Sequence, residues 1–154
     1  MAGWEPLVVP GLLQTVPYAH AVFREIGMID DQEDLDRRVV DRIRRQAVLR
    51  RANRPALTAV IGEAGLRNPI GGMTVLRDQL KYLVEVSERG NVTIRVMPAA
   101  TGGHPGLDGS FMRLRFADRP AVAFVGCLCT SVYMENTSNS RCSTGSSPNS
   151  RSVP

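Results

Sequence analysis

Residues 56–98, ALTAVIGEAGLRNPIGGMTVLRDQLKYLVEVSERGNVTIRVMP, decide the fold. The apolar run at 56–61 predicts a buried strand. From 73 to 88, apolar residues recur at helical spacing, which predicts a helix closed by the Arg-Gly pair that follows. Residues 92–96 then alternate between apolar and polar, as a half-buried strand does, and a proline ends the run. The expected inner face of the helix is Leu76, Leu80, Leu83 and Val84.

Two helices are expected before this stretch. The first runs over about 12–26 and is closed by Gly27. The second, over about 31–51, has acids at its start and arginines at its end, which matches the helix dipole at both termini. The upstream run at 4–11 predicts an extended segment packed on the core. The expected inner face of the second helix is Leu35, Val39, Val40, Ile43, Ala47 and Val48.

Beyond this stretch, a glycine-rich loop at 99–109 leads into predicted strands at 111–116 and 121–125. The sequence therefore predicts an α+β fold. Two N-terminal helices precede a three- or four-stranded mixed sheet, and one further helix packs on that sheet.

Length and composition limit the possible classes of protein. The chain has 154 residues, enough for one domain. Its apolar runs are too short to span a membrane and its start lacks the pattern of a secretion signal, so we expect a cytoplasmic protein. Lys81 is the only lysine among 19 basic residues, which is typical of a GC-rich genome, and the net charge of +4 does not indicate direct DNA binding. Three cysteines and two histidines are too few and too scattered for a metal site, and no cofactor is indicated.

The composition changes abruptly near residue 135. Serine is scarce before this point and abundant after it, so we assign residues 1–135 to the domain and 136–154 to a Ser-rich disordered tail. Two origins of the tail remain open. It is either a natural tail or the product of a frameshift, because an out-of-frame reading of a helix in a GC-rich gene gives Ser, Arg, Pro and Thr.

Six residues are candidates for binding a ligand or partner. Gln14 and Tyr18 lie one turn apart on the first helix, as do Glu63 and Arg67 after the first predicted strand. His104 and Asp108 lie in the glycine-rich loop. Each has a structural alternative: a hydrogen bond into the core, an ion pair within the domain, or a plain connecting loop. No catalytic motif occurs, but an enzyme site formed by Glu63, Arg67 and His104 is the alternative to a binding domain.

Several strings, taken in order, resemble one family. The sequence is similar to the domain of unknown function that follows an Xre-type (lambda-repressor-like) helix-turn-helix in actinobacterial transcriptional regulators. The similarity extends over residues 4–135. The strings are Trp4-Glu5-Pro6, Val9-Pro10-Gly11-Leu12-Leu13-Gln14-Thr15, Arg45-Gln46, Glu63-Ala64, Gln79-Leu80, Asn91-Val92-Thr93-Ile94 and Gly103-His104-Pro105-Gly106.

This resemblance implies a regulatory domain that senses a small ligand or binds a small companion protein, while a preceding module binds DNA. Two departures matter. No helix-turn-helix precedes Trp4 in this sequence, and the helix expected after Glu135 is replaced by the Ser-rich segment. The second departure predicts an uncovered apolar face, and with it self-association. A truncated gene product without function is a further alternative.

Overall fold

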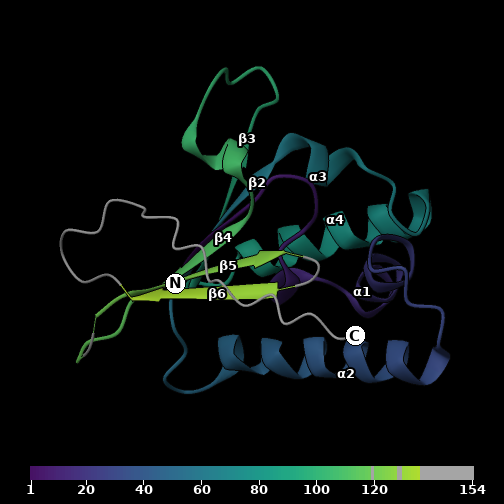
Figure 1. The fold of residues 1–154 in the computed structure, drawn as a ribbon, viewed down its shortest axis with the longest axis horizontal. Coiled ribbons are helices and arrows are strands. Elements are labelled where there is room, and N and C mark those ends of the chain that lie inside the picture. Colours follow the sequence, from purple (N-terminus) through teal and green to yellow (C-terminus); the bar gives the residue numbers. More distant parts are fainter. Residues whose placement is uncertain (119, 128–129, 136–154) are drawn as a thin grey trace, which may run out of the picture.

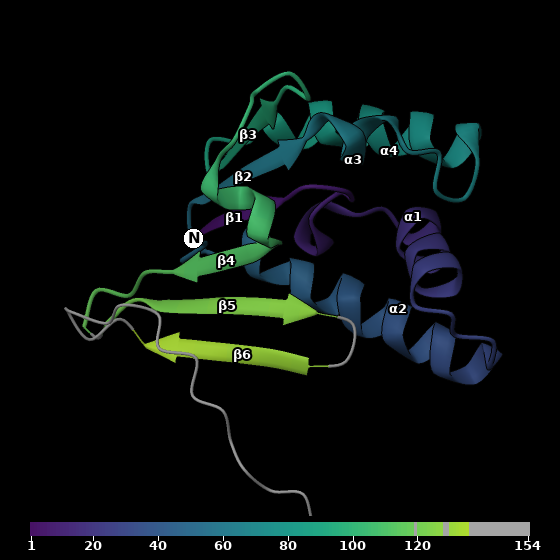
Figure 2. The same ribbon diagram turned by 45° about the horizontal axis from the view of Figure 1, so that its top comes forward.

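The computed structural model describes residues 1–118, 120–127 and 130–135. Its centre is a six-stranded mixed sheet with strand order β3-β2-β1-β4-β5-β6. The strands are β1 (Ala2–Glu5), β2 (Leu57–Gly62), β3 (Val92–Met97), β4 (Phe111–Leu114), β5 (Val122–Cys127) and β6 (Thr130–Glu135). β1, β2 and β3 are parallel, whereas β4, β5 and β6 continue the sheet in antiparallel pairs. Figure 1 shows the fold as a whole, and Figure 2 shows β5 and β6 at the edge of the sheet away from α3 and α4.

The connections between the parallel strands contain the helices, because parallel neighbours require long crossovers. The α-helices are α1 (Val16–Ala21), α2 (Gln32–Gln46), α3 (Glu63–Arg67) and α4 (Met73–Ser87). Shorter helical turns are η1 (Gly11–Leu13), η2 (Val22–Ile26), η3 (Ala47–Arg50) and η4 (Pro105–Asp108). The predicted combination of helices with a mixed sheet is confirmed.

The predicted number of strands was too low. The segment 4–11 was expected to be extended but not a strand, yet its start belongs to β1, which lies between β2 and β4. β6 was not predicted either. β1 has only four residues and ends before Pro6, so it lacks the long alternation that marks a strand in sequence. β1 is defined by pairing with the distant strands β2 and β4 rather than by its own pattern, whereas β6 pairs antiparallel with β5, the preceding strand in the sequence.

Helix α2 forms as its sequence predicts. Asp31 is its N-cap and its carboxylate accepts a hydrogen bond from the amide of Asp34 at 2.7 Å. Leu35 and Val39 are buried, as expected. Val40, expected on the same face, is instead 53% exposed, because a stripe that includes both 39 and 40 is wider than the surface this helix buries.

Helix α4 covers the parallel part of the sheet. Leu76, Leu83 and Val86 are buried with Leu57 and Val92 of the strands in one apolar core. Val84, predicted on this inner face, is 64% exposed. Consecutive residues such as 83 and 84 point in directions about 100° apart around a helix, so only one of the two side chains can point straight at the sheet.

The first predicted helix is divided into three pieces. Residues 11–13 form a 3₁₀ turn, α1 begins after the N-cap Thr15, and η2 is a π-helical turn in which the Gly27 amide bonds to the Val22 carbonyl at 3.1 Å. Gly27 is the C-cap as predicted, although its backbone stays right-handed. The prediction of a disordered tail at 136–154 concerns residues outside the described ones.

Candidate ligand-binding site

Gln14 and Tyr18, two of the predicted site residues, both bind the backbone of Val9. The Gln14 Nε2 donates to the Val9 carbonyl at 2.7 Å, and the Val9 amide donates to the Tyr18 hydroxyl at 3.3 Å. Both side chains are almost fully buried. Burial raises the pKa of the Tyr18 hydroxyl, so it stays neutral. These two residues fix the chain after β1, which is the structural alternative considered for them.

Two further buried glutamines hold the same segment from neighbouring helices. Gln46 of α2 donates to the carbonyls of Gly11 and Gln14 at 3.0 and 2.8 Å. Gln79 of α4 donates to the Leu13 carbonyl at 2.8 Å and accepts from the Thr15 amide at 2.7 Å. We refer to Gln14, Gln46 and Gln79 as the glutamine clasp. It places a rigid, internally bonded segment between α2 and α4.

Arg42 of α2 completes this clasp. Its guanidinium donates to the Gln14 Oε1 at 2.9 Å and lies 4.2 Å from the centre of the Phe23 ring. Burial raises the pKa of nearby Glu5, at the end of β1, to about 7, and the positive charge of Arg42 opposes this rise. Glu5 is therefore a carboxyl group that changes charge near neutral pH, a property that its sequence context does not reveal.

Glu63 and Arg67 form the ion pair that was the structural alternative for them. The Arg67 guanidinium lies 2.7 Å from the Glu63 Oε1. The Glu63 Oε2 accepts from the Ala99 amide at 2.9 Å. The hydrogen bond from the Ala99 amide lowers the pKa of Glu63 most, and the charge of Arg67 lowers it further. Glu63 is therefore a weaker base. Glu63 thereby ties the end of β2 to the segment that follows β3.

His104 packs against Trp4 of β1. The two rings are T-shaped, with centroids 5.4 Å apart. The Trp4 Nε1 donates to the Gly106 carbonyl at 2.7 Å, which fixes η4 over β1, as Figure 2 shows. Asp108, at the end of η4, is exposed. The glycine-rich loop is therefore a cover over the tryptophan.

The described contacts do not unite the three residues of the enzyme alternative. Glu63 and Arg67 bind each other, whereas His104 contacts Trp4, and no hydrogen bond or ion pair in residues 1–118, 120–127 and 130–135 links the two groups. In the same part of the chain no three histidine, cysteine or acidic side chains form a group that could hold a metal ion. Cys129 and Cys142 lie outside the described residues.

An open hollow lies at the opposite end of the parallel strands. Because β2 and β3 are parallel and Leu57 pairs with Val92, the segments that enter the two strands lie side by side. Asn91 joins them: its Nδ2 donates to the carbonyls of Leu49 and Pro55 at 3.2 and 3.3 Å. The hollow between the segments has a volume of about 530 Å³. We call it the arginine hollow, and its lining is Leu49, Arg50, Arg54, Arg89, Gly90 and Asn91.

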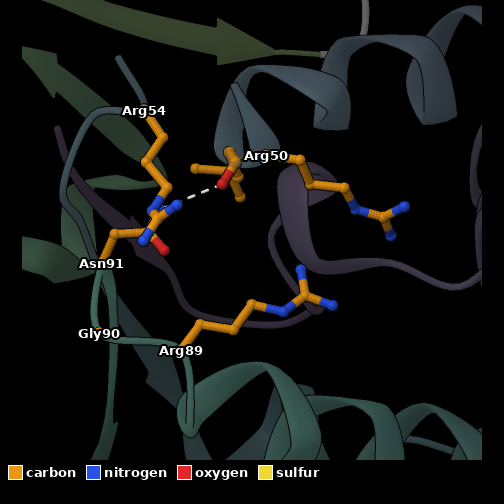
Figure 3. A pocket seen from close by; sticks show the side chains of 6 residues that line it. Arg50, Arg54, Arg89, Gly90 and Asn91 are labelled. Atoms are coloured by element: carbon orange, nitrogen blue, oxygen red, sulfur yellow. Dashed lines mark hydrogen bonds between the residues drawn. The ribbon is translucent and has the colours of Figure 1, made fainter. Parts of the chain in front are cut away.

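Three arginines from three segments reach this hollow. Arg50 ends η3, Arg54 lies in the turn before β2, and Arg89 follows α4. Figure 3 shows the guanidinium groups of Arg50 and Arg89 at one end and that of Arg54 at the other, beside Asn91. The hollow thus presents positive charge at both of its ends.

These arginines have no acidic partner in the part of the chain that the structure describes. The ion pairs found there join other residues, namely Arg37 and Arg38 with Asp34, Arg44 with Asp41, Arg67 with Glu63, and Arg77 and Lys81 with Asp78. The nearby ends of η3 and α4 contribute about half a negative charge each, which three full positive charges outweigh. The hollow is therefore suited to an anion.

Sequence reasoning missed these arginines as a site. Arg50 looked like the solvated end of a basic helix, Arg54 like part of the break that follows this helix, and Arg89 like part of a helix stop. Only the parallel register of β2 and β3 brings Arg89 to the other two. The family string that begins with Asn91-Val92 could have pointed to this region, because Asn91 fixes the wall of the hollow.

The sheet, the clasp and the hollow belong to one mixed α/β domain. The chain matches a family described as a domain of unknown function (DUF5753) over residues 1–142 and belongs to it. No curated protein and no solved structure gives a significant match. Among the described residues, no helix is both long and apolar enough to cross a membrane.

Proposed function

We propose that the chain is the effector-binding domain of a transcriptional regulator, and that it binds an anionic ligand in the arginine hollow without transforming it. The observation that carries the proposal is the contrast between the hollow and the candidate catalytic groups. Arg50, Arg54 and Arg89 border an open volume and have no acidic partner among the described residues. The carboxylate of Glu63 and the ring of His104 instead contact Ala99, Arg67 and Trp4.

The electrostatics support binding rather than catalysis. A guanidinium stays charged at any physiological pH and offers fixed donors that match phosphate and carboxylate oxygens, but it is a poor proton acceptor. The hollow has no histidine, carboxylate, thiol or hydroxyl side chain in its lining. A ligand seated there would meet donors and positive charge and no general base or nucleophile.

The role in transcription rests on the resemblance to domains that follow a helix-turn-helix. A domain of this kind would report ligand occupancy to a DNA-binding module joined to it. Arg50 ends η3, which follows α2 directly, and α2 is joined to the N-terminal segment by Gln46 and Arg42. The hollow and the start of the chain are thus connected through one helix.

A chimera tests this proposal. A lambda-repressor-like helix-turn-helix of known operator is placed ahead of Met1, and operator affinity is titrated with and without saturating pyrophosphate. We expect the affinity to change about fivefold or more, the lower range of allosteric coupling. The change should vanish in Arg54→Gln and persist in Arg51→Gln, a neighbouring arginine outside the hollow. Unchanged operator affinity with pyrophosphate bound would refute the regulatory role, and release of phosphate from pyrophosphate, followed by ³¹P NMR, would refute the absence of catalysis.

A further inference from the structure

The arginine hollow also contains features that restrict the chemistry of its ligand. Its volume of about 530 Å³ lies within the range of pockets that hold organic ligands and far exceeds the needs of one inorganic ion. Its charges are distributed over two ends, with Arg50 and Arg89 at one and Arg54 at the other. A single small anion would leave one end without a partner.

The donors in the hollow are suited to phosphate. Each guanidinium presents several N–H groups in a planar fork, a geometry that binds phosphate oxygens in pairs. Two phosphate groups in sequence would bring negative charge both to the Arg50 and Arg89 pair and toward Arg54. This arrangement uses all three arginines, whereas a monophosphate would contact only part of them.

Asn91 adds an acceptor to a hollow that otherwise offers donors. Its Nδ2 is already bonded to the Leu49 and Pro55 carbonyls, which fixes the orientation of the amide. The Oδ1 accepts no hydrogen bond from the residues that the structure describes, and no buried side-chain nitrogen or oxygen in that part of the chain lacks a partner. The Oδ1 is therefore open to solvent beside Arg54, where a hydroxyl or amine of a ligand could donate to it.

We infer that the ligand of the arginine hollow is an organic diphosphate, a small molecule with two linked phosphate groups and an organic part that donates a hydrogen bond to Asn91. This inference rests on the proposed function and specifies its ligand. The linked phosphates span the three arginines, and the organic part extends past Gly90, where the lack of a side chain leaves open space.

A ligand series on the full chain at about 0.15 M ionic strength, where exposed charges are screened within about 8 Å, tests each part of this description by calorimetry. The probes are ADP, AMP, pyrophosphate, inorganic phosphate, and citrate as an anion without phosphorus. ADP should bind about tenfold more tightly than AMP, which lacks the second phosphate, since one charge-assisted hydrogen bond is worth about a factor of ten. ADP should exceed pyrophosphate by a similar factor, because pyrophosphate has no organic donor for Asn91.

Matched variants locate the binding. Arg50→Gln, Arg54→Gln and Arg89→Gln should each weaken ADP binding about tenfold. Arg51→Gln removes the same charge from an exposed neighbouring residue outside the lining, and should change binding less than about twofold because solvent and salt screen a charge that does not contact the ligand. Equal losses in all four variants would mean that only the general positive field attracts the nucleotide, and would overturn the inference.

The outcomes separate this inference from the proposed function. If pyrophosphate binds in an Arg54-dependent way but ADP binds no better, the organic part is not recognised and the inference fails, while the anionic effector site stands. If citrate equals pyrophosphate, the preference for phosphate fails in the same way. If a short DNA duplex binds more tightly than ADP and competes with it, the phosphates belong to a nucleic acid backbone and the small-molecule inference is wrong. If no probe responds to the three arginine variants, both proposals fail.

Discussion

The glutamine clasp and the arginine hollow differ in whether their polar side chains are bonded within the protein. In the clasp, Gln14, Gln46 and Gln79 are buried and their side-chain amides bind backbone groups of the segment after β1. In the hollow, Arg50 and Arg54 are exposed and form no ion pair with any described residue. Buried polar groups must be paired to be tolerated, whereas exposed charges can remain available to a ligand.

This difference separates stability from binding. The family string that contains Pro10-Gly11-Leu12-Leu13-Gln14-Thr15 belongs to the clasp, where its backbone is held by α2 and α4. A recognisable motif is thus explained here by the need to satisfy a buried, irregular segment. The candidate ligand site lies elsewhere and consists of residues that resemble ordinary surface arginines in the sequence.

The largest effect on stability is expected in the clasp. Gln79→Ala removes one buried and one partly buried hydrogen bond and leaves the Leu13 carbonyl and the Thr15 amide unpaired. It should lower the free energy of unfolding by about 3 kcal/mol. Urea unfolding measures the change. Glu85→Gln, an exposed change on the same helix, should have no measurable effect. A loss below about 1 kcal/mol for Gln79→Ala would show that the clasp contributes little.

The cover over Trp4 should be the next most sensitive region. A Cβ at Gly106 would lie 2.6 Å from the Trp4 Nε1, so Gly106→Ala must displace η4 or break the indole hydrogen bond. We expect a loss of about 2 kcal/mol, within the range for breaking a buried hydrogen bond with local repacking. Gly103→Ala, in the same loop but with open space around the added methyl group, should be nearly neutral. Equal thermal melting of both variants would contradict the close packing of η4 on Trp4.

The regular elements could be predicted because local pattern determines them. Caps or periodicity that act within a few residues mark three elements: the helix that Asp31 caps, the helix at 73–87 and the strand at 57–62. β1 could not be predicted, since its four residues become a central strand only through β2 and β4.

The candidate site was even harder to predict from the sequence. Arg54 and Arg89 are 35 positions apart, and only the register of Leu57 with Val92 brings their segments together. Gln14 and Tyr18 were recognised as noteworthy, but the sequence left open whether they bind a ligand or the protein itself. Both side chains bind Val9, a contact fixed by the turn after β1.

Glu5 provides a smaller, pH-dependent test near the clasp. Its folded pKa of about 7 exceeds the usual 4.5, so between these values the folded state binds more protons than the unfolded chain. Stability should therefore fall as pH rises from about 4.5 to 7 and level off above this window. Glu5→Gln mimics the protonated group and should remove about 1–2 kcal/mol of this decline, less than the full shift because the carboxyl is partly exposed. Melting curves at pH 5 and pH 8 check it, and an unchanged decline in Glu5→Gln would assign the pH dependence to other groups.

The arginine hollow should show the smallest effect on folding. Arg50→Gln and Arg89→Gln remove exposed or half-exposed charges that form no ion pair with the described residues, so stability without ligand should change by less than about 0.5 kcal/mol. Urea unfolding of the two variants beside Arg51→Gln tests this. A loss comparable to that of Gln79→Ala would place these arginines in the structural framework and remove the contrast between the two regions.

The most direct test of the account is the pyrophosphate-induced change in melting temperature for the wild-type chain, Arg54→Gln and Arg51→Gln. A ligand that binds only the folded state raises the melting temperature, and the rise grows with ligand concentration relative to Kd. The account predicts a clear rise for the wild type and for Arg51→Gln, and little or none for Arg54→Gln, with all three chains melting alike when no pyrophosphate is present. An equal rise in all three would show that pyrophosphate does not bind in the arginine hollow and would contradict the separation of binding from the glutamine clasp.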